Sequence, residues 1–178
     1  MIDFGPIIIE DGLIQSEVWR KRQTVRAVIQ NESGALLMVY SKMFDDYTFP
    51  GGGIQQHEDI TEALKRELHE ELGALSVLIK EHIGQTQELR YGVKGTDHVY
   101  LQTSDYYLCE IPYFGEQHLM EREMLHGLEP RWINIEDALM HNLKVMNNDR
   151  HQVKGLKTVL IRENKVLKAL KENNHETI

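Results

Sequence analysis

The feature that most constrains this chain is the segment at positions 49–74, which reads FPGGGIQQHEDITEALKRELHEELGA. Asp59 is a good helix N-cap, Glu62 stands three residues later as the capping-box partner, and Gly73 occupies the position of a helix C-terminal glycine. These signals predict a helix over Ile60–Leu72. Any fold for this chain must therefore place a short, well-bounded helix shortly after a glycine-rich bend.

Two glutamates of this helix lie on its apolar face. At about 100° per residue, the apolar residues gather in one arc; they are Ile60, Ala63, Leu64, Leu68 and Leu72. Glu67 and Glu71 fall near the middle of that arc, and Glu70 falls at its edge. An ionised carboxylate that leaves water without a partner is strongly destabilising. The pattern therefore predicts a positive charge beside these glutamates.

A divalent cation fits these carboxylates best. Residues one helical turn apart have Cβ atoms about 5–6 Å apart, and Mg²⁺ and Mn²⁺ take hard oxygen ligands such as carboxylates. The bend Pro50–Gly53 lets the backbone come close to an ion or a phosphate. Arg66 is placed to pair with a neighbouring glutamate and to fix its rotamer. Two alternatives remain open: a solvated acidic helix face, which the helical wheel disfavours, and a buried arginine–glutamate network without metal.

These residues also resemble the Nudix box, G-x5-E-x7-R-E-U-x-E-E-x-G-U, in which U is an aliphatic residue. The box is matched by Gly52, Glu58 and the run Arg66–Ala74. Two positions depart from the common pattern. The last position is Ala74 rather than a bulkier aliphatic residue, and His57 stands where many members have glycine before the first glutamate. Neither departure removes a ligand.

The resemblance implies an α/β protein, a Nudix-type α/β/α sandwich with a mixed central sheet. It also implies hydrolysis, dependent on Mg²⁺ or Mn²⁺, of a phosphoanhydride bond in a nucleoside diphosphate linked to another moiety. The implied metal ligands are Gly51, through its carbonyl, and Glu58, Glu67, Glu70 and Glu71. The implied catalytic set is Arg66, Glu67, Glu70 and Glu71, in which Arg66 orients Glu67, and Glu67 or a loop glutamate accepts a proton.

Weaker candidates lie outside the box. Phe44 and Tyr47 can stack on a base or cap the core, and the core is the better interpretation for aromatic residues beside a strand. Arg90, Tyr91 and Lys94 are candidates for contacting substrate phosphate, although exposed hairpin tips carry such residues routinely.

The irregular stretch 115–131 supplies two further candidates. In Nudix hydrolases a glutamate of this loop often adds a metal ligand or acts as the general base. Glu121 and Glu123 rank first by their position in the loop, although any single glutamate there is more often merely solvated.

The rest of the chain reads as strands and covering helices. The predicted strands are 24–29, 35–40, 75–83, 99–111 and 132–135. The turn at 31–34 predicts a hairpin of the first two strands, and the polar stretch 85–97 predicts the tip of a long hairpin. A helix start at 136 and a packing helix at 149–172, capped by Asn147 to Asp149, follow.

Composition sets the class of protein. The 178 residues, 41% of them hydrophobic, indicate a single domain over 1–178. Positions 1–22 form an N-terminal extension whose basic run 19–22 reads as a solvated edge or linker, and whose first 15 residues would cover a neighbouring subunit in a homodimer. The net charge of -8 argues against nucleic-acid binding and leaves a small nucleotide derivative as the expected partner. With the single Cys109, no basic signal start and no spanning segment, we expect a cytoplasmic protein without membrane contact.

Three alternatives compete with this enzyme. One is a catalytically inactive Nudix-fold module that binds a ligand or regulates, although such members usually lose box glutamates. A second is an isopentenyl-diphosphate isomerase, which is related in fold and would need a reactive cysteine. A third is a carboxylate-bridged di-iron protein, which would need Glu-x-x-His pairs in a helical bundle.

Overall fold

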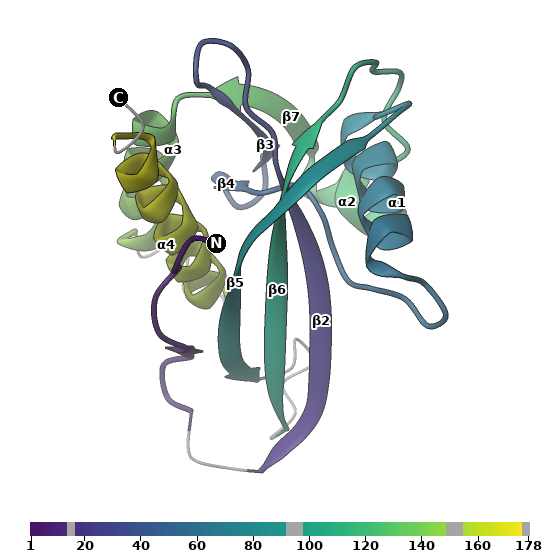
Figure 1. Ribbon diagram of the computed structural model, residues 1–178. Helices are drawn as coiled ribbons and strands as arrows, with labels where there is room; N and C mark the ends of the chain where they lie inside the picture. The colour runs from purple at the N-terminus through teal and green to yellow at the C-terminus, as the bar shows by residue number, and fades with distance from the viewer. Residues whose placement is uncertain (14–16, 92–97, 149–154, 176–178) are drawn as a thin grey trace.

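The computed structural model describes residues 1–13, 17–91, 98–148 and 155–175 (Figure 1). Within these ranges the strands form two sheets. The four-stranded sheet has the order β1 (Ile8–Ile9), β5 (Leu78–Tyr91), β6 (Val99–Glu110) and β2 (Val18–Val28), and the three-stranded sheet has the order β4 (Asp46–Thr48), β3 (Leu36–Ser41) and β7 (Leu128–Ile133). The helices are α1 (Ile60–Leu72), α2 (Glu121–His126), α3 (Ile135–Met146) and α4 (Leu156–His175).

The helices cover the sheets from two sides, with α1 and α2 on one side and α3 and α4 on the other (Figure 1). One buried cluster packs α1 on β2, through Ala63, Leu64, Leu68, Val25 and Ala27. Another packs α3 and α4 on the strands, through Ala138, Val166, Leu167, Val28 and Tyr106. The sheet is mixed, because β2 runs parallel to β6 whereas β5 runs antiparallel to it. The predicted α/β/α sandwich with a mixed sheet is confirmed.

Several predicted boundaries were wrong. The segment at 19–22 is exposed, as expected of a solvated edge, but it belongs to the edge strand β2 rather than to a linker, and 85–91 belongs to β5 rather than to a hairpin tip. The turn at 31–34 does bring Leu36 beside Gln30, but β2 and β3 then diverge into different sheets instead of forming a hairpin. Residues 85–91 extend the first strand of the predicted long hairpin, because β5 pairs antiparallel with β6. The segment 19–22 and β3 instead pair with β6 and β7, which are distant in sequence, and local residue patterns do not contain that information.

The C-terminal region also differs from the prediction. Ile135 begins α3 instead of ending a strand, because Asn134 caps that helix by accepting a hydrogen bond from the Glu136 amide at 2.9 Å. Asn147 ends α3, and α4 begins at Leu156. The expected cap at Asp149 lies outside the described residues.

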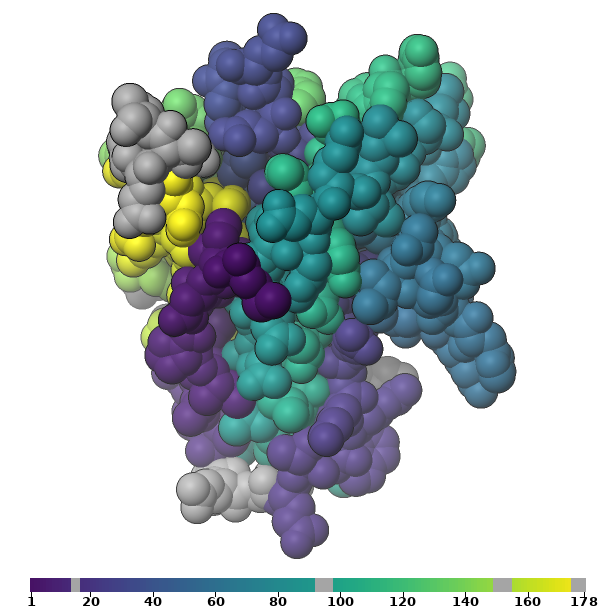
Figure 2. Space-filling view, in the orientation of Figure 1, coloured from purple at the N-terminus to yellow at the C-terminus, as the bar shows by residue number. Residues whose placement is uncertain are grey.

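The N-terminal segment covers its own chain. β1 pairs parallel with β5, and Figure 2 shows this purple segment lying along the teal strand. Phe4 is 4% exposed and packs edge-on against Tyr106 at a centroid distance of 5.2 Å. Phe4 and Ile8 are thus used within the fold, whereas Ile7 and Ile9 are 42% and 57% exposed, so a role of this segment as a cover for a neighbouring subunit stays a prediction.

None of the helices in the described part of the chain combines the length and the apolar character needed to cross a membrane.

Candidate active site

Helix α1 has the ends that its sequence predicts. The Asp59 carboxylate accepts from the Glu62 amide at 2.8 Å, and the Glu62 carboxylate accepts from the Asp59 amide at 2.9 Å. Gly73 ends the helix with a φ of 69°, in the left-handed region that favours glycine. These caps fix where the helix starts, and thereby fix which of its residues face inward.

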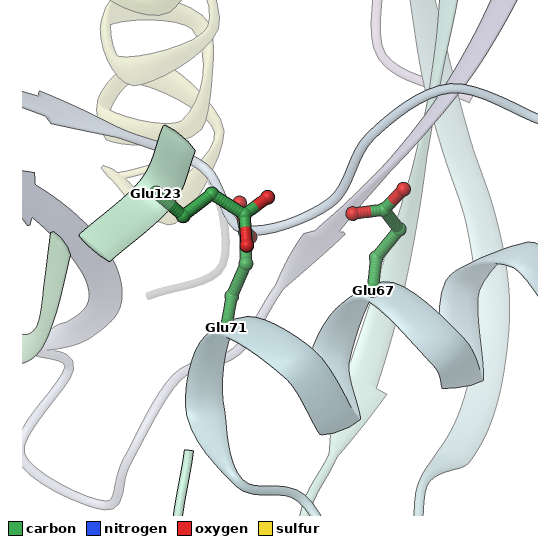
Figure 3. A group of neighbouring side chains, drawn as sticks. All are labelled: Glu67, Glu71 and Glu123. Carbon is green, nitrogen blue, oxygen red and sulfur yellow. The ribbon is translucent and has the colours of Figure 1, made fainter. Parts of the chain in front are cut away.

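Three carboxylates meet beside this helix. Glu67 and Glu71 are each 8% exposed, as the helical wheel predicts, and Glu123 reaches them from α2. One oxygen from each of the three lies within 4.8 Å of the others. Glu67 and Glu71 project from the same side of α1, with Glu123 close to Glu71 (Figure 3). Of the two loop candidates, the structure brings in Glu123, whereas Glu121 is exposed and outside this group.

Arg66 ties the first glutamate of the box to the helix. Its guanidinium donates to both carboxylate oxygens of Glu58, at 2.7 and 3.0 Å, and to Glu67 at 2.8 Å. A further bond of 3.1 Å reaches the Gly53 carbonyl, and Glu70 lies 3.6 Å away. Arg66 holds the pKa of the Glu58 carboxyl below its ordinary value, so Glu58 stays ionised. Because Arg66 is itself held by Glu58 and Gly53, its bond to Glu67 fixes the rotamer of Glu67.

Glu71 is set between the glycine bend and a cationic side chain. Burial raises the pKa of its carboxyl to about 8, against the lowering effects of the Arg26 charge and of a hydrogen bond from the Gly51 amide. That amide donates to Glu71 at 2.8 Å, and the Gly51 carbonyl accepts from Arg26 at 2.5 Å. Gly51 has a φ of 129°, and a Cβ there would lie 2.2 Å from the Val25 carbonyl oxygen. Only glycine fits this bend.

The oxygen donors fit a hard divalent cation. Arg66 offsets the charges of Glu58 and Glu67, but within the described ranges Glu71 and Glu123 make no ion pair with any residue. A buried arginine–glutamate network therefore exists, yet it leaves Glu71 and Glu123 without an ion pair among the described residues, although the charge of Arg26 also acts on Glu71. Oxygen-only ligands with several carboxylates suit Mg²⁺ or Mn²⁺ rather than softer metals.

The clustered carboxylates line a cleft of about 860 Å³. Arg90 and Tyr91, two of the predicted substrate-contact residues, line it, and Lys94 lies outside the described residues. Tyr47 is 8% exposed and belongs to the core, so for this residue the core interpretation was right. Phe44 packs edge-on against His126 at a centroid distance of 4.9 Å and does not line the cleft.

The sequence analysis missed the arginines of β2. Arg20, Arg22 and Arg26 line the cleft, on the face of the strand opposite Val25 and Ala27. Their spacing of two and four residues is the signal that could have identified them, because alternate residues of a strand share one face. The basic run 19–22 had been treated as a surface feature instead.

Two alternatives fail on the structure. Helix α1 packs on a sheet rather than in a helical bundle, which is wrong for a di-iron carboxylate protein. Cys109 is 1% exposed, and burial raises the pKa of its thiol to about 12, so it lacks the thiolate character that an isomerase would need.

Comparison with known proteins agrees with this geometry. A family model described as NUDIX domain matches residues 20–155. Among solved structures, a NUDIX hydrolase from Nitrosomonas europaea is 16% identical and aligns with a TM-score of 0.56 over 88% of this chain and 90% of that one. A MutT protein from Methanosarcina mazei Go1 is 18% identical, with a TM-score of 0.49 over 89% and 99%. The first likeness indicates a shared fold. No curated protein matches by sequence.

Proposed function

This chain belongs to the Nudix hydrolase family, and from that premise we propose that it hydrolyses, with Mg²⁺ or Mn²⁺, a phosphoanhydride bond in a nucleoside diphosphate linked to another moiety. The observation that carries the proposal is the approach of Glu67, Glu71 and Glu123 within 4.8 Å of one another at the edge of an open cleft. We keep a cytoplasmic location as an expectation.

Each residue of the site has a part in the proposed reaction. Glu67, Glu71 and Glu123 would hold the metal, with Glu70, Glu58 and the Gly51 carbonyl as further donors. The bound metal would offset the diphosphate charge and lower the pKa of the attacking water. Arg66 keeps Glu67 in one rotamer through its 2.8 Å bond. A carboxylate near the water then accepts its proton, and Glu67 and Glu123 are the candidates for this base.

A substrate panel tests the proposal directly. Hydrolysis of a P–O–P bond by one water yields two phosphate-terminated products. With a nucleoside diphosphate sugar, orthophosphate should therefore appear only when a phosphatase is added afterwards, and only with Mg²⁺ or Mn²⁺ present. The panel should also include dinucleoside polyphosphates, nucleoside triphosphates and coenzyme diphosphates. Binding without turnover of any member would favour the inactive ligand-binding module instead.

Substitution of Gly52 by alanine tests the placement of Glu67. A Cβ at this position would lie 2.4 Å from the carboxylate carbon of Glu67, the mobile end of a side chain, so the fold should persist while Glu67 moves. Displacing a ligand by about 1 Å can cost on the order of 100-fold in rate, and we expect a loss of that size in kcat. The matched control is Gly53→Ala, whose nearest contact is the flexible Arg22 end at 3.3 Å. Equal activity in both variants would contradict the role of Glu67.

A further inference from the structure

A row of arginines crosses the sheet where it borders the cleft. In the register of the sheet, Arg20 of β2 stands opposite Tyr100 of β6, which stands opposite Arg90 of β5. One step along, Arg22 stands opposite Gln102. Because residues in register point to the same face of a sheet, these side chains share one surface. Positive charge is thus collected on the sheet side of the cleft, beside the carboxylates of α1.

Most of these arginines have no carboxylate partner. Within the described ranges, no ion pair is found for Arg20, Arg22 or Arg26 of β2, nor for Arg122 of α2, and all four line the cleft. The chain carries 28 acidic and 20 basic residues, so acidic partners are abundant. Elsewhere the fold does pair its buried arginines, as with Arg162 and Glu88 at 3.1 Å. Among the arginines that the structure describes, those without an ion pair therefore all line the cleft.

Arg22 lies close to several other arginines. Its side chain reaches water, but enclosure by the cleft walls and then the charges of neighbouring arginines lower the pKa of its guanidinium; these neighbours are Arg26, Arg90, Arg162 and Arg122. The end of Arg22 lies 3.3 Å from where a Gly53 Cβ would be, so it sits beside the glycine bend. An anion bound by Arg22 would thus lie next to the proposed metal site and would relieve the repulsion.

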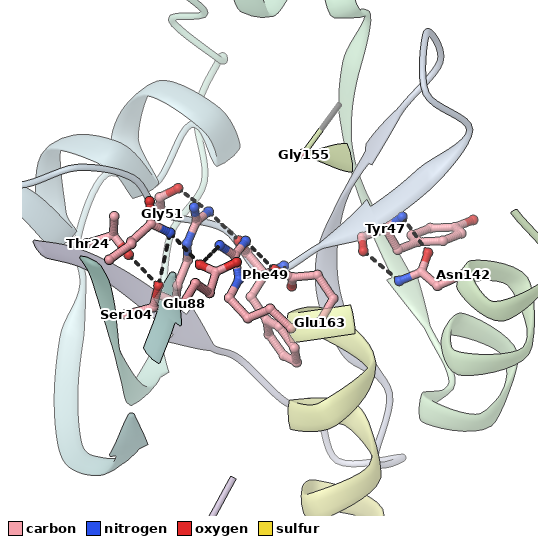
Figure 4. Close-up of polar contacts among 12 residues, drawn as sticks. Thr24, Tyr47, Phe49, Gly51, Glu88, Ser104, Asn142, Gly155 and Glu163 are labelled. Carbon is pink, nitrogen blue, oxygen red and sulfur yellow. Dashed lines mark hydrogen bonds and ion pairs between the residues drawn. The ribbon is translucent and has the colours of Figure 1, made fainter. Parts of the chain in front are cut away.

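Arg90 is positioned by two buried carboxylates, those of Glu10 and Glu88. Its guanidinium lies 3.9 Å from Glu10 and 3.8 Å from Glu88, contacts too long to be hydrogen bonds. Glu88 is fully buried and accepts from Gln102 at 2.7 Å as well as from Arg162 (Figure 4). The buried oxygens of Glu10 and one oxygen of Glu88 have no hydrogen-bond donor among the described residues. Arg90 is therefore oriented by these charges and by a weak hydrogen bond of 3.5 Å to the Gly155 carbonyl, and its guanidinium makes no hydrogen bond to either carboxylate.

We propose that Arg22 and Arg90, with Arg20 beside them, form a second anion site that binds a phosphate adjoining the metal-bound diphosphate. The substrate class is then a chain of three or more phosphates, as in a nucleoside triphosphate or a dinucleoside polyphosphate, in preference to a nucleoside diphosphate sugar. This inference rests on the proposed function for its assignment of the diphosphate. The anion site itself does not depend on turnover.

Binding of inorganic tripolyphosphate in excess EDTA separates the two proposals, because it needs neither metal nor hydrolysis. We expect Arg22→Gln to bind tripolyphosphate about tenfold more weakly than wild type by calorimetry, as befits loss of a charge-assisted contact. Lys80→Gln is the matched control: it removes the same charge from an exposed position of β5 outside the cleft. Arg22→Lys, which keeps the charge but loses the two-pronged donor, should fall between them.

A second experiment measures the kinetics of the same variants in the presence of Mg²⁺ or Mn²⁺. Arg22→Gln should lower the ratio of kcat/KM for a nucleoside triphosphate over that for a nucleoside diphosphate sugar by about tenfold, while Lys80→Gln leaves the ratio unchanged. Tripolyphosphate affinity that is equal in wild type and Arg22→Gln, with both melting at the same temperature, would overturn the inference. Absence of turnover with every substrate would instead defeat the proposed function, and the calorimetry would still decide on the anion site.

Discussion

Substituting Glu71 by glutamine is expected to abolish metal-dependent hydrolysis, lowering kcat by about 10³-fold or more. Glu71 is only 8% exposed and has no ion-pair partner in the described part of the chain, so its charge is available to a cation. Removing one preorganised charged group from an active site typically costs 10²–10³-fold, and a lost metal ligand adds to that. The measurement is Mn²⁺ titration followed by phosphate release in wild type and variant.

The same variant should remain folded, which separates chemistry from stability. Glutamine has the shape of the protonated carboxyl, and its carbonyl can still accept from the Gly51 amide, a bond of 2.8 Å in wild type. Burial raises the pKa of Glu71 to about 8, so metal-free wild type should lose stability as pH rises from about 4.5 to 8, whereas the variant loses less. Unchanged Mn²⁺ affinity in Glu71→Gln would count against its assignment as a ligand.

The affinity for Mn²⁺ should also depend on pH, because a metal ion and a proton compete for Glu71. At pH 6 most Glu71 carboxyls are protonated in the metal-free protein, since the pKa is about 8. A cation must then displace a proton, because only the ionised carboxylate is a ligand. Affinity for Mn²⁺ should therefore rise with pH up to about 8 in wild type, and this dependence should weaken in Glu71→Gln.

Local signals were enough to predict the centre of the site. Caps at Asp59 and Gly73 bound the helix, and the helical wheel placed Glu67 and Glu71 inward, as the structure has them. Such signals act within a few residues of one another, so a single sequence contains them. Contacts with Glu123 depend instead on how α2 packs beside α1, and sequence could only rank that glutamate beside Glu121.

The sheet side of the cleft could not be predicted in the same way. Arg22 and Arg90 are 68 residues apart in the chain (90 − 22) and are brought together by β6, which pairs with both of their strands. Strand partners are chosen by tertiary packing rather than by local propensity. The alternation of arginines in β2 indicates a common face, but which surface that face borders is a property of the assembled sandwich.

Replacing Arg162 by leucine should lower the free energy of unfolding by about 3–5 kcal/mol, since removing one partner of a buried ion pair leaves an uncompensated charge. Arg162 is 2% exposed and donates to Glu163 at 2.5 and 2.9 Å and to Glu88 at 3.1 Å. Both carboxylates are fully buried. Denaturant unfolding measures the loss. Leucine fills part of the volume of the arginine side chain but offers no hydrogen-bond donor, so the charges of Glu88 and Glu163 lose their cationic partner.

The same substitution should also impair the active site, because the two partners of Arg162 contact the glycine bend and the sheet side of the cleft. Glu163 accepts from the Phe49 amide at 2.8 Å, just before the glycine bend (Figure 4). Glu88 accepts from Gln102 at 2.7 Å and lies 3.8 Å from Arg90. Arg162→Leu should therefore also weaken Mn²⁺ binding under conditions where the variant is folded. Arg131→Leu is the matched control, since Arg131 is paired with Glu129 at the surface and such pairs contribute about 0–1 kcal/mol. Equal stability of the two variants would show that the buried network is neutral to folding.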